Sequence, residues 1–275
     1  MTVVDQTLVS VLIPVYNMGE FIEAAISSVL DGGYQYVEIL IIDDGSTDDT
    51  KQLVEPYVNS ENVKFDSRVQ YFYKPNGGKS SALNLGLKYY KGAYFTILDA
   101  DDCLSVRALH CRAETVNKFK NSKSMIIGSF EVFENDTVVG RRPAPHDISA
   151  EQLSVKFYFS LKTPFHLNAS LISRPLADSV GLFDTKLIRC QDGDYAIRCL
   201  QRTEILETTD EVVYRYRKHR ESRADRVKFR LRTAKHRMRV LNNNFDGPQK
   251  VLMLLGCLMM DGLKLGYEMF GNFKS

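Results

Sequence analysis

The sequence predicts an α/β fold with a mostly parallel central sheet flanked by helices and a helical C-terminal extension. Three observations support this prediction. Apolar runs alternate with helical patterns through the first hundred residues, each strand is followed by a helix before the next strand, and two of the apolar runs end in clusters of aspartates. Such an order favours parallel strands joined by right-handed crossovers.

The first half of the chain is expected to hold four strands and three helices. Apolar, β-branched runs predict strands at 9–16, 37–42, 69–73 and 93–98. Helical spacing predicts helices at 20–30 and 80–90, and a third helix is expected from Thr47. Ser46 is the expected cap of that third helix, and Asp48 and Asp49 suit its positive end.

The rhythm changes after residue 102. We expect a helix at 107–119, a hairpin whose strands 125–133 and 137–141 flank the turn 134–136, strands at 166–173 and 206–216, and a helix at 194–202. Two last helices are expected at 224–245 and 249–270, separated by Asp246-Gly247-Pro248.

Composition fits a soluble globular protein of the cytoplasm. The 275 residues are 44% hydrophobic and 25% charged, which is ordinary for this class. The five cysteines have no CxxC spacing, so neither a zinc site nor a disulfide framework is indicated, and a reducing compartment fits best. The apolar stretch 9–15 is too short for a signal peptide or a membrane span.

The positive charge is concentrated near the C-terminus. Residues 215–240 hold twelve of the 36 Lys and Arg and two of the 34 acidic residues, a balance of +10 that leaves −8 for the remainder. This segment is either a solvated helix face or a peripheral contact with anionic lipid on the inner face of the membrane. The apolar stretch 251–260 is too short to span a bilayer and is expected to be an interfacial helix, a homodimer seam or a packed helix. No nucleic-acid motif is present, and the acidic remainder argues against a nucleic-acid partner.

The aspartates that follow two strands indicate a site at one edge of the sheet. Asp99, Asp101 and Asp102 directly follow an apolar run, although clustered carboxylates repel one another. A divalent cation held by carboxylates and a substrate phosphate is the usual compensation. Asp43 and Asp44 follow the second run, and open α/β folds bind ligands at this edge. The alternative for the upstream pair is a simple turn with a helix cap.

Three further segments carry candidate site residues. The loop 74–81 ends in Gly-Lys-Ser but is not a P-loop, because Tyr73 stands where that motif needs glycine. It is either a turn that starts a helix or a close approach to a ligand, with Lys79 as a nearby cation. Asp192 and Asp194 begin a helix, as a cap or as a general base. His219, among arginines, is either a surface residue or a metal ligand beside a phosphate.

The ordered set of motifs resembles the family 2 glycosyltransferases, which are inverting enzymes of the Rossmann-like GT-A fold with a DXD motif. The matching segments span residues 9 to 222 in the family's order and at its spacing. They are Val11-Leu12-Ile13-Pro14-Val15-Tyr16-Asn17, Ile41-Ile42-Asp43-Asp44-Gly45-Ser46-Thr47-Asp48, Asn76-Gly77-Gly78-Lys79-Ser80-Ser81-Ala82-Leu83-Asn84-Leu85-Gly86, Leu98-Asp99-Ala100-Asp101-Asp102, Gln191-Asp192-Gly193-Asp194 and Tyr214-Arg215-Tyr216-Arg217-Lys218-His219.

The resemblance implies a role for each matching residue. Those at the nucleotide-sugar site are Pro14, Tyr16 and Asp44 at the nucleobase, most often uracil, Asp43 and Asn84 supporting this pocket or the ribose, Lys79 beside them, and Asp99 at the ribose or sugar. Asp101 would bind Mn2+ or Mg2+, and His219 would complete the metal or diphosphate site. Asp192 would be the catalytic base, with Asp194 as its rival, although Gln191 departs from the family's usual Glu at that position.

The expected function is an inverting, metal-dependent glycosyltransferase. Residues 1–118 would bind a nucleotide-sugar donor, a UDP-sugar above all. Residues 119–222 would bind a sugar, lipid-linked or protein-linked acceptor for polysaccharide, glycolipid or glycan synthesis, and 223–275 would form basic C-terminal helices. Inversion is expected because no carboxylate nucleophile is singled out. The alternatives are a sugar-phosphate nucleotidyltransferase, whose basic Gly-rich loop is missing at 17–20, and an inactive nucleotide- or sugar-binding module.

Overall fold

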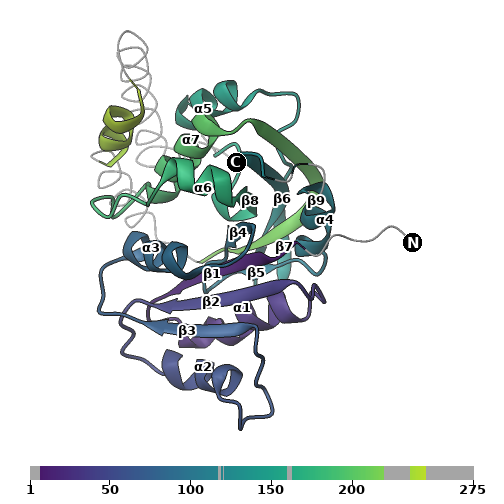
Figure 1. Cartoon of the computed structure of the whole chain (residues 1–275), viewed down its shortest axis with the longest axis vertical. Helices are drawn as coiled ribbons and strands as arrows, with labels where there is room; N and C mark the ends of the chain where they lie inside the picture. Colours follow the sequence, from purple (N-terminus) through teal and green to yellow (C-terminus); the bar gives the residue numbers. More distant parts are fainter. Residues whose placement is uncertain (1–6, 117–118, 120, 160–162, 220–235, 246–275) are drawn as a thin grey trace, which may run out of the picture.

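The computed structural model describes residues 7–116, 119, 121–159, 163–219 and 236–245 (Figure 1). Helices and strands alternate along most of this chain. In order they are β1 (Val9–Val15), α1 (Gly19–Leu30), β2 (Val37–Asp43), α2 (Thr50–Val58), β3 (Val69–Tyr73), α3 (Lys79–Tyr89), β4 (Tyr94–Ile97), β5 (Cys103–Leu104), α4 (Ala108–Val116), β6 (Ser124–Glu134), β7 (Thr137–Arg142), α5 (Ala150–Phe159), η1 (Leu167–Ala169), β8 (Ser170–Ser173), α6 (Arg174–Val180), α7 (Gln191–Arg202) and β9 (Ile205–Arg217).

A single sheet runs through the described part of the protein. Its strand order is β3-β2-β1-β4-β8-β6-β9-β5, with β7 paired to β6. The first four strands of the chain are parallel, β8 is antiparallel to both of its neighbours, and β6 and β9 are parallel again. The prediction of a mostly parallel sheet flanked by helices is therefore confirmed.

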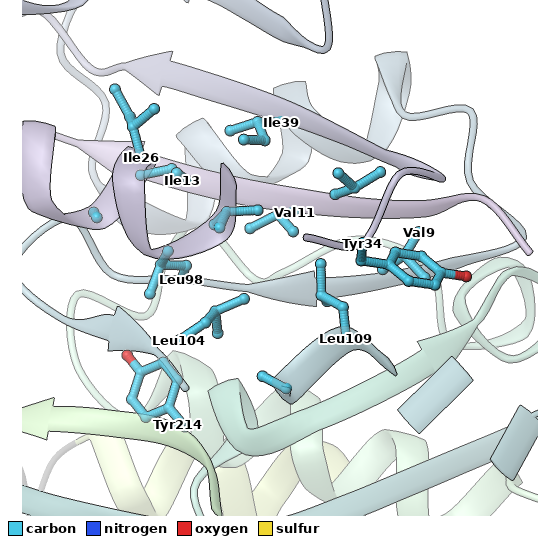
Figure 2. Close-up of a cluster of buried hydrophobic side chains, with 14 of the residues drawn as sticks. Val9, Val11, Ile13, Ile26, Tyr34, Ile39, Leu98, Leu104, Leu109 and Tyr214 are labelled. Carbon is cyan, nitrogen blue, oxygen red and sulfur yellow. The ribbon is translucent and has the colours of Figure 1, made fainter. Parts of the chain in front are cut away.

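Both faces of the parallel strands are buried, which explains their nearly continuous apolar sequences. In β1, Val11 and Ile13 point to one side, toward α1, α2 and α4, where Ile26, Ile39 and Leu109 join them (Figure 2). Leu12 points to the other side and packs in a second core beneath α3, α6 and α7. The sheet is therefore rigidly held between two layers.

The strand register brings the predicted site segments to one edge. Val15 of β1 lies opposite Asp43 of β2, and Asp43 lies opposite Tyr73 of β3. On the other side of β1, Leu12 lies opposite Ile97 of β4. The loops that follow these four strands therefore share one end of the sheet, where the candidate site is built.

Several local expectations were wrong. The second helix begins at Thr50 instead of Thr47, and Ser46 does not cap it, because the Ser46 hydroxyl accepts from the Asn17 amide (3.0 Å). The 3-10 helix η1 replaces the first half of the strand expected at 166–173, and α5 and α6 were not anticipated.

The expected C-terminal helices lie mostly outside the described residues. Residues 236–244 are helical, in agreement with the first of them, whereas the helix expected at 249–270 and most of the basic segment 215–240 cannot be compared. No helix among the residues described has the length and hydrophobicity that crossing a membrane requires.

Candidate active site

A cavity of about 340 Å³ opens at the shared end of the parallel strands. Pro14 and Tyr16 line it from the end of β1, and 47% of the Tyr16 side chain is exposed. Asp44, Lys79, Asp99 and Asp101 contribute charged groups from three other segments. Six residues that the sequence assigned to the nucleotide sugar or its metal ion therefore line one cavity.

The two aspartates at the end of β2 are engaged in internal contacts. Asp43 is 1% exposed and accepts hydrogen bonds from the Ser46 amide (2.7 Å) and the Tyr71 hydroxyl (2.6 Å). Asp44 forms an ion pair with Lys74, which sequence reasoning missed. Asp44 also accepts from the Gly77 and Gly78 amides, at 3.0 and 2.6 Å, and so fixes the loop that leads into α3.

Lys79, the first residue of α3, joins two carboxylates across the cavity. Its ammonium lies 2.8 Å from Asp99 and 3.2 Å from Asp192. Burial would lower the pKa of Lys79, but the charges of Asp192 and Asp99 outweigh burial and raise it above its ordinary value. Burial would raise the pKa of Asp99, but Lys79 outweighs this and holds it low. Lys79 and Asp99 are therefore both charged near neutral pH.

The three aspartates after β4 lie close together but have different surroundings. Asp99, Asp101 and Asp102 each offer an oxygen within 4.8 Å of the others. Asp102 is 2% exposed and accepts from the Tyr214 hydroxyl and the Arg217 amide. Burial, reinforced by the charge of Asp99, raises the pKa of Asp102 to about 8. Asp101 instead contacts the exposed imidazole of His219, 2.8 Å from its Nε2.

Asp192 and Asp194 lie two residues apart in α7 but have different surroundings. Asp194 is 1% exposed, and its carboxylate is bound by Arg198 (2.8 Å) and Asn244 (2.8 Å). Asp192 is only partly buried and faces Lys79, and its Oδ1 has no hydrogen-bond partner among the residues that the structure describes. The geometry favours Asp192 over Asp194 as the group available to a substrate.

Asn84 has a different setting from the cavity residues. Its side-chain amide donates to the Phe183 carbonyl (3.0 Å), and its oxygen accepts from the Phe183 amide (2.8 Å). It therefore ties α3 to the loop before α7. Its assigned support of the donor pocket stays a prediction.

A buried chain of polar contacts around Asp102 was missed, because Asn168 and His166 have no distinctive sequence pattern. The Asn168 amide donates to the Tyr214 hydroxyl (2.8 Å), which donates to Asp102. Tyr214 also stacks on His166, with ring centroids 5.2 Å apart, and burial lowers the pKa of His166. Strand β9 is thereby fixed against the acidic cluster.

The curled, mostly parallel sheet with an acidic cluster at its carboxyl edge is the GT-A fold. The chain belongs to glycosyl transferase family 2, whose model matches residues 10–177.

Curated relatives carry the same kind of name. An uncharacterized glycosyltransferase of Rickettsia typhi is 31% identical over 199 residues, which are 72% of this chain and 60% of the relative. The Escherichia coli protein WfgD, named a UDP-Glc:alpha-D-GlcNAc-diphosphoundecaprenol beta-1,3-glucosyltransferase, is 33% identical over 54% of this chain and 56% of its own length. The chain spans only 36% of a similar protein from Rickettsia felis.

Solved structures share the fold at low sequence identity. The complex of S. aureus TarS 1–349 with UDP aligns with a TM-score of 0.68 and 18% identity, covering 97% of this chain and 75% of that one. The mannosyltransferase PcManGT from Pyrobaculum calidifontis, in complex with GDP-Man and Mn2+, aligns with a TM-score of 0.61 and 20% identity, covering 96% and 73%.

Proposed function

We propose that the protein transfers a sugar from a UDP-sugar to an acceptor hydroxyl with inversion at the anomeric carbon. The observation that carries the proposal is the meeting of Asp99, Lys79 and Asp192 beside a cavity that Pro14 and Tyr16 also line. TarS was solved with UDP and with UDP-GlcNAc, which supports uracil as the base. Residues 1–118 are proposed as the donor half and 119–222 as the acceptor half.

The nucleotide is proposed to bind along the ends of β1 and β2. The exposed ring of Tyr16 offers an apolar face for the base, because a base can stack on an aromatic side chain. Asp44 lines the same cavity, and Lys74 and two backbone amides hold its carboxylate in place. Asp43 is proposed to keep the Asp44 loop in shape.

The acidic cluster fits a divalent cation such as Mn2+ or Mg2+. Its members supply hard oxygen ligands within 4.8 Å of one another, and Asp101 with His219 would hold the ion. A bound cation would neutralise the charge that builds on the departing diphosphate. Lys79 adds a fixed positive charge on the same side of the cavity.

Asp192 is proposed to accept the proton of the attacking hydroxyl. Its side chain is 34% exposed, so an acceptor hydroxyl can approach the carboxylate and donate to it. Direct attack by that hydroxyl breaks the bond between the anomeric carbon and the diphosphate in one step, and one displacement inverts the centre. Lys79 donates to Oδ2 of Asp192 and keeps the carboxylate oriented.

The acceptor is proposed to be a saccharide, carried on a lipid or a protein. The name of WfgD points to a sugar on diphosphoundecaprenol as one such acceptor. The basic segment 215–240 is proposed to bring the enzyme to an anionic membrane surface at the cytoplasmic side. Residues 223–275 are proposed to form the C-terminal helices of this contact or of a homodimer.

The test is donor hydrolysis, in which water replaces the unknown acceptor. Wild type with Mn2+ and UDP-glucose or UDP-GlcNAc is expected to release the β-anomer of the sugar before mutarotation, as followed by proton NMR. Asp192→Asn and Asp101→Asn should abolish this release, whereas Asp31→Asn, at an exposed helix end, should not. Release of the α-anomer would overturn inversion. Pyrophosphate production from UTP and a sugar 1-phosphate would instead identify a nucleotidyltransferase.

A further inference from the structure

The first turn of α7, which carries Asp192, follows a residue with an unusual backbone conformation. This N-cap residue, Cys190, has a left-handed backbone with φ of 62°. Such a conformation is costly for a non-glycine residue and persists only where its surroundings enforce it. The position of Asp192 therefore depends on what packs around the start of α7.

Residues 236–245, which we name the C-terminal brace, supply much of that packing. Val240, Leu241 and Phe245 are buried in a small core with Leu187 and Ile197, before and within α7. This core is separate from the two cores that flank the sheet. The brace therefore holds the catalytic segment from outside the GT-A sheet.

Polar contacts join the brace to the same segment at two points. The Asn244 side-chain amide donates to Asp194 (2.8 Å), two residues after Asp192, and Arg198 binds the same carboxylate. Arg239 forms an ion pair with Asp184 in the loop before α7 (2.9 Å). The loop and the first turn of the helix are both attached to the brace.

A closed circuit of contacts links the brace to the cavity. Asn84 of α3 binds the backbone of Phe183, next to Asp184, and Lys79 at the start of α3 binds Asp192. The segment that carries Asp192 therefore contacts α3 through Lys79 and Asn84, and it contacts the C-terminal brace through Asp184 and Asp194.

We propose that the C-terminal brace positions the catalytic base, with Asn244 and Arg239 as positioning residues that act through Asp194 and Asp184. This inference rests on the proposed role of Asp192. In this proposal Asp194 is a positioning residue and not the catalytic base. Through its contact with Asp194, the C-terminal brace sets the position of Asp192. Catalysis by Asp192 thus depends on residues 236–245, which lie, like Asp192 itself, beyond the family match at 10–177.

The test compares two asparagines of one helix. Asn244→Ala removes the donor to Asp194, and Asn242→Ala is the matched control, because Asn242 is exposed on the same helix. We expect kcat for UDP-sugar hydrolysis to fall roughly 10- to 100-fold in Asn244→Ala, since small misplacements of catalytic groups have effects of this size. The Kd for UDP with Mn2+ should stay within about two-fold, because the donor cavity keeps its own contacts. Asn242→Ala should match wild type in both.

A second variant and a second measurement keep the test decisive if Asn244→Ala does not fold or if the wild type is inactive. Arg239→Ala removes a partly exposed contact and leaves the buried core of the brace in place, and its kcat is expected to fall in the same direction. Hydrogen exchange should quicken at residues 182–194 in Asn244→Ala and not in β1 to β4. Wild-type kcat in both brace variants, or unchanged exchange at 182–194, would overturn the inference. An inactive wild type would contradict the proposed function, while the exchange measurement still decides whether the brace holds this segment.

Discussion

Strands β2 and β4 both end in aspartates, yet the two ends serve different purposes. At the end of β2, both carboxylates are bound by the protein itself, through the Ser46 amide, the Tyr71 hydroxyl and Lys74. At the end of β4, Asp102 is bound in this way, whereas Asp99 pairs with Lys79 of the cavity lining and Asp101 with the exposed His219. An apolar run followed by acidic residues therefore marks the edge of the sheet that carries the site, and the partners of each carboxylate separate structural from substrate-facing aspartates.

The largest expected effect is at the open side of β4. Asp101→Asn keeps the shape of the side chain but removes a charge from the proposed metal site, so we expect donor hydrolysis to fall roughly 10²- to 10³-fold. The melting temperature of the apoprotein should hardly change, because Asp101 is only partly buried. Stabilisation by UDP with Mn2+ in a thermal-shift assay should disappear. A variant with normal activity would show that Asp101 is not part of the site.

The corresponding substitution at β2 should act on stability instead. Asp43→Ala leaves the Ser46 amide and the Tyr71 hydroxyl without their acceptor inside the protein. We expect the free energy of unfolding to fall by about 1–3 kcal/mol, as measured by urea denaturation. Asp31→Ala, at an exposed position, is the control. Full stability with loss of UDP binding would move Asp43 from the structural class into the donor site.

Asp102 should make the stability of the metal-free protein depend on pH. Its pKa is about 8 in the folded state, against about 3.9 for an unfolded Asp, because it is buried near Asp99. Between these values the folded state binds more protons than the unfolded state, so stability decreases as pH rises from about 4 to about 8, by about 1 kcal/mol per pH unit at most. Asp102→Asn should flatten this slope in urea titrations with EDTA. A slope that survives the substitution would assign it to another group.

The sequence predicted this edge of the sheet because its signals are local. Continuous apolar runs identified β1 to β4, and the parallel arrangement placed their ends together. The expected cap at Ser46 failed because Asn17, from another loop, takes that hydroxyl. The start of α2 was set by a tertiary contact that lies 29 residues away in sequence.

The second half of the chain was harder to predict, because its site residues are positioned by contacts between residues far apart in sequence. Lys79 and Asp192 are 113 residues apart in sequence, and no periodic pattern connects them. The family resemblance selected Asp192, but the structural use of Asp194 became visible only with Arg198 and Asn244 beside it. Short elements such as η1 and α6 have too few residues for a clear period, so their strand and helix signals could not be separated.

The last comparison concerns the loops around Asp44, where two glycines both have a positive φ but differ in the space available to a side chain. Gly45 has φ of +82°, and a Cβ there would lie 2.8 Å from the Asn76 amide nitrogen. Gly78 has φ of +87°, with no atom within 4 Å of a Cβ. Gly78 also has ψ of 162°, so Gly78→Ala should cost only the strain of this glycine-specific backbone conformation, about 1–3 kcal/mol in unfolding free energy.

Gly45→Ala should lower the free energy of unfolding by a larger amount. The loop after β3 must move away from the new Cβ, and this movement also disturbs the hydrogen bonds of Asp44 to that loop. Urea denaturation of the two variants, with UDP affinity as a second measurement, separates conformation from packing. Equal losses of stability would mean that the loop after β3 adjusts to the new Cβ at little cost. The end of β2 would then be a flexible part of the proposed donor site and not a rigid one.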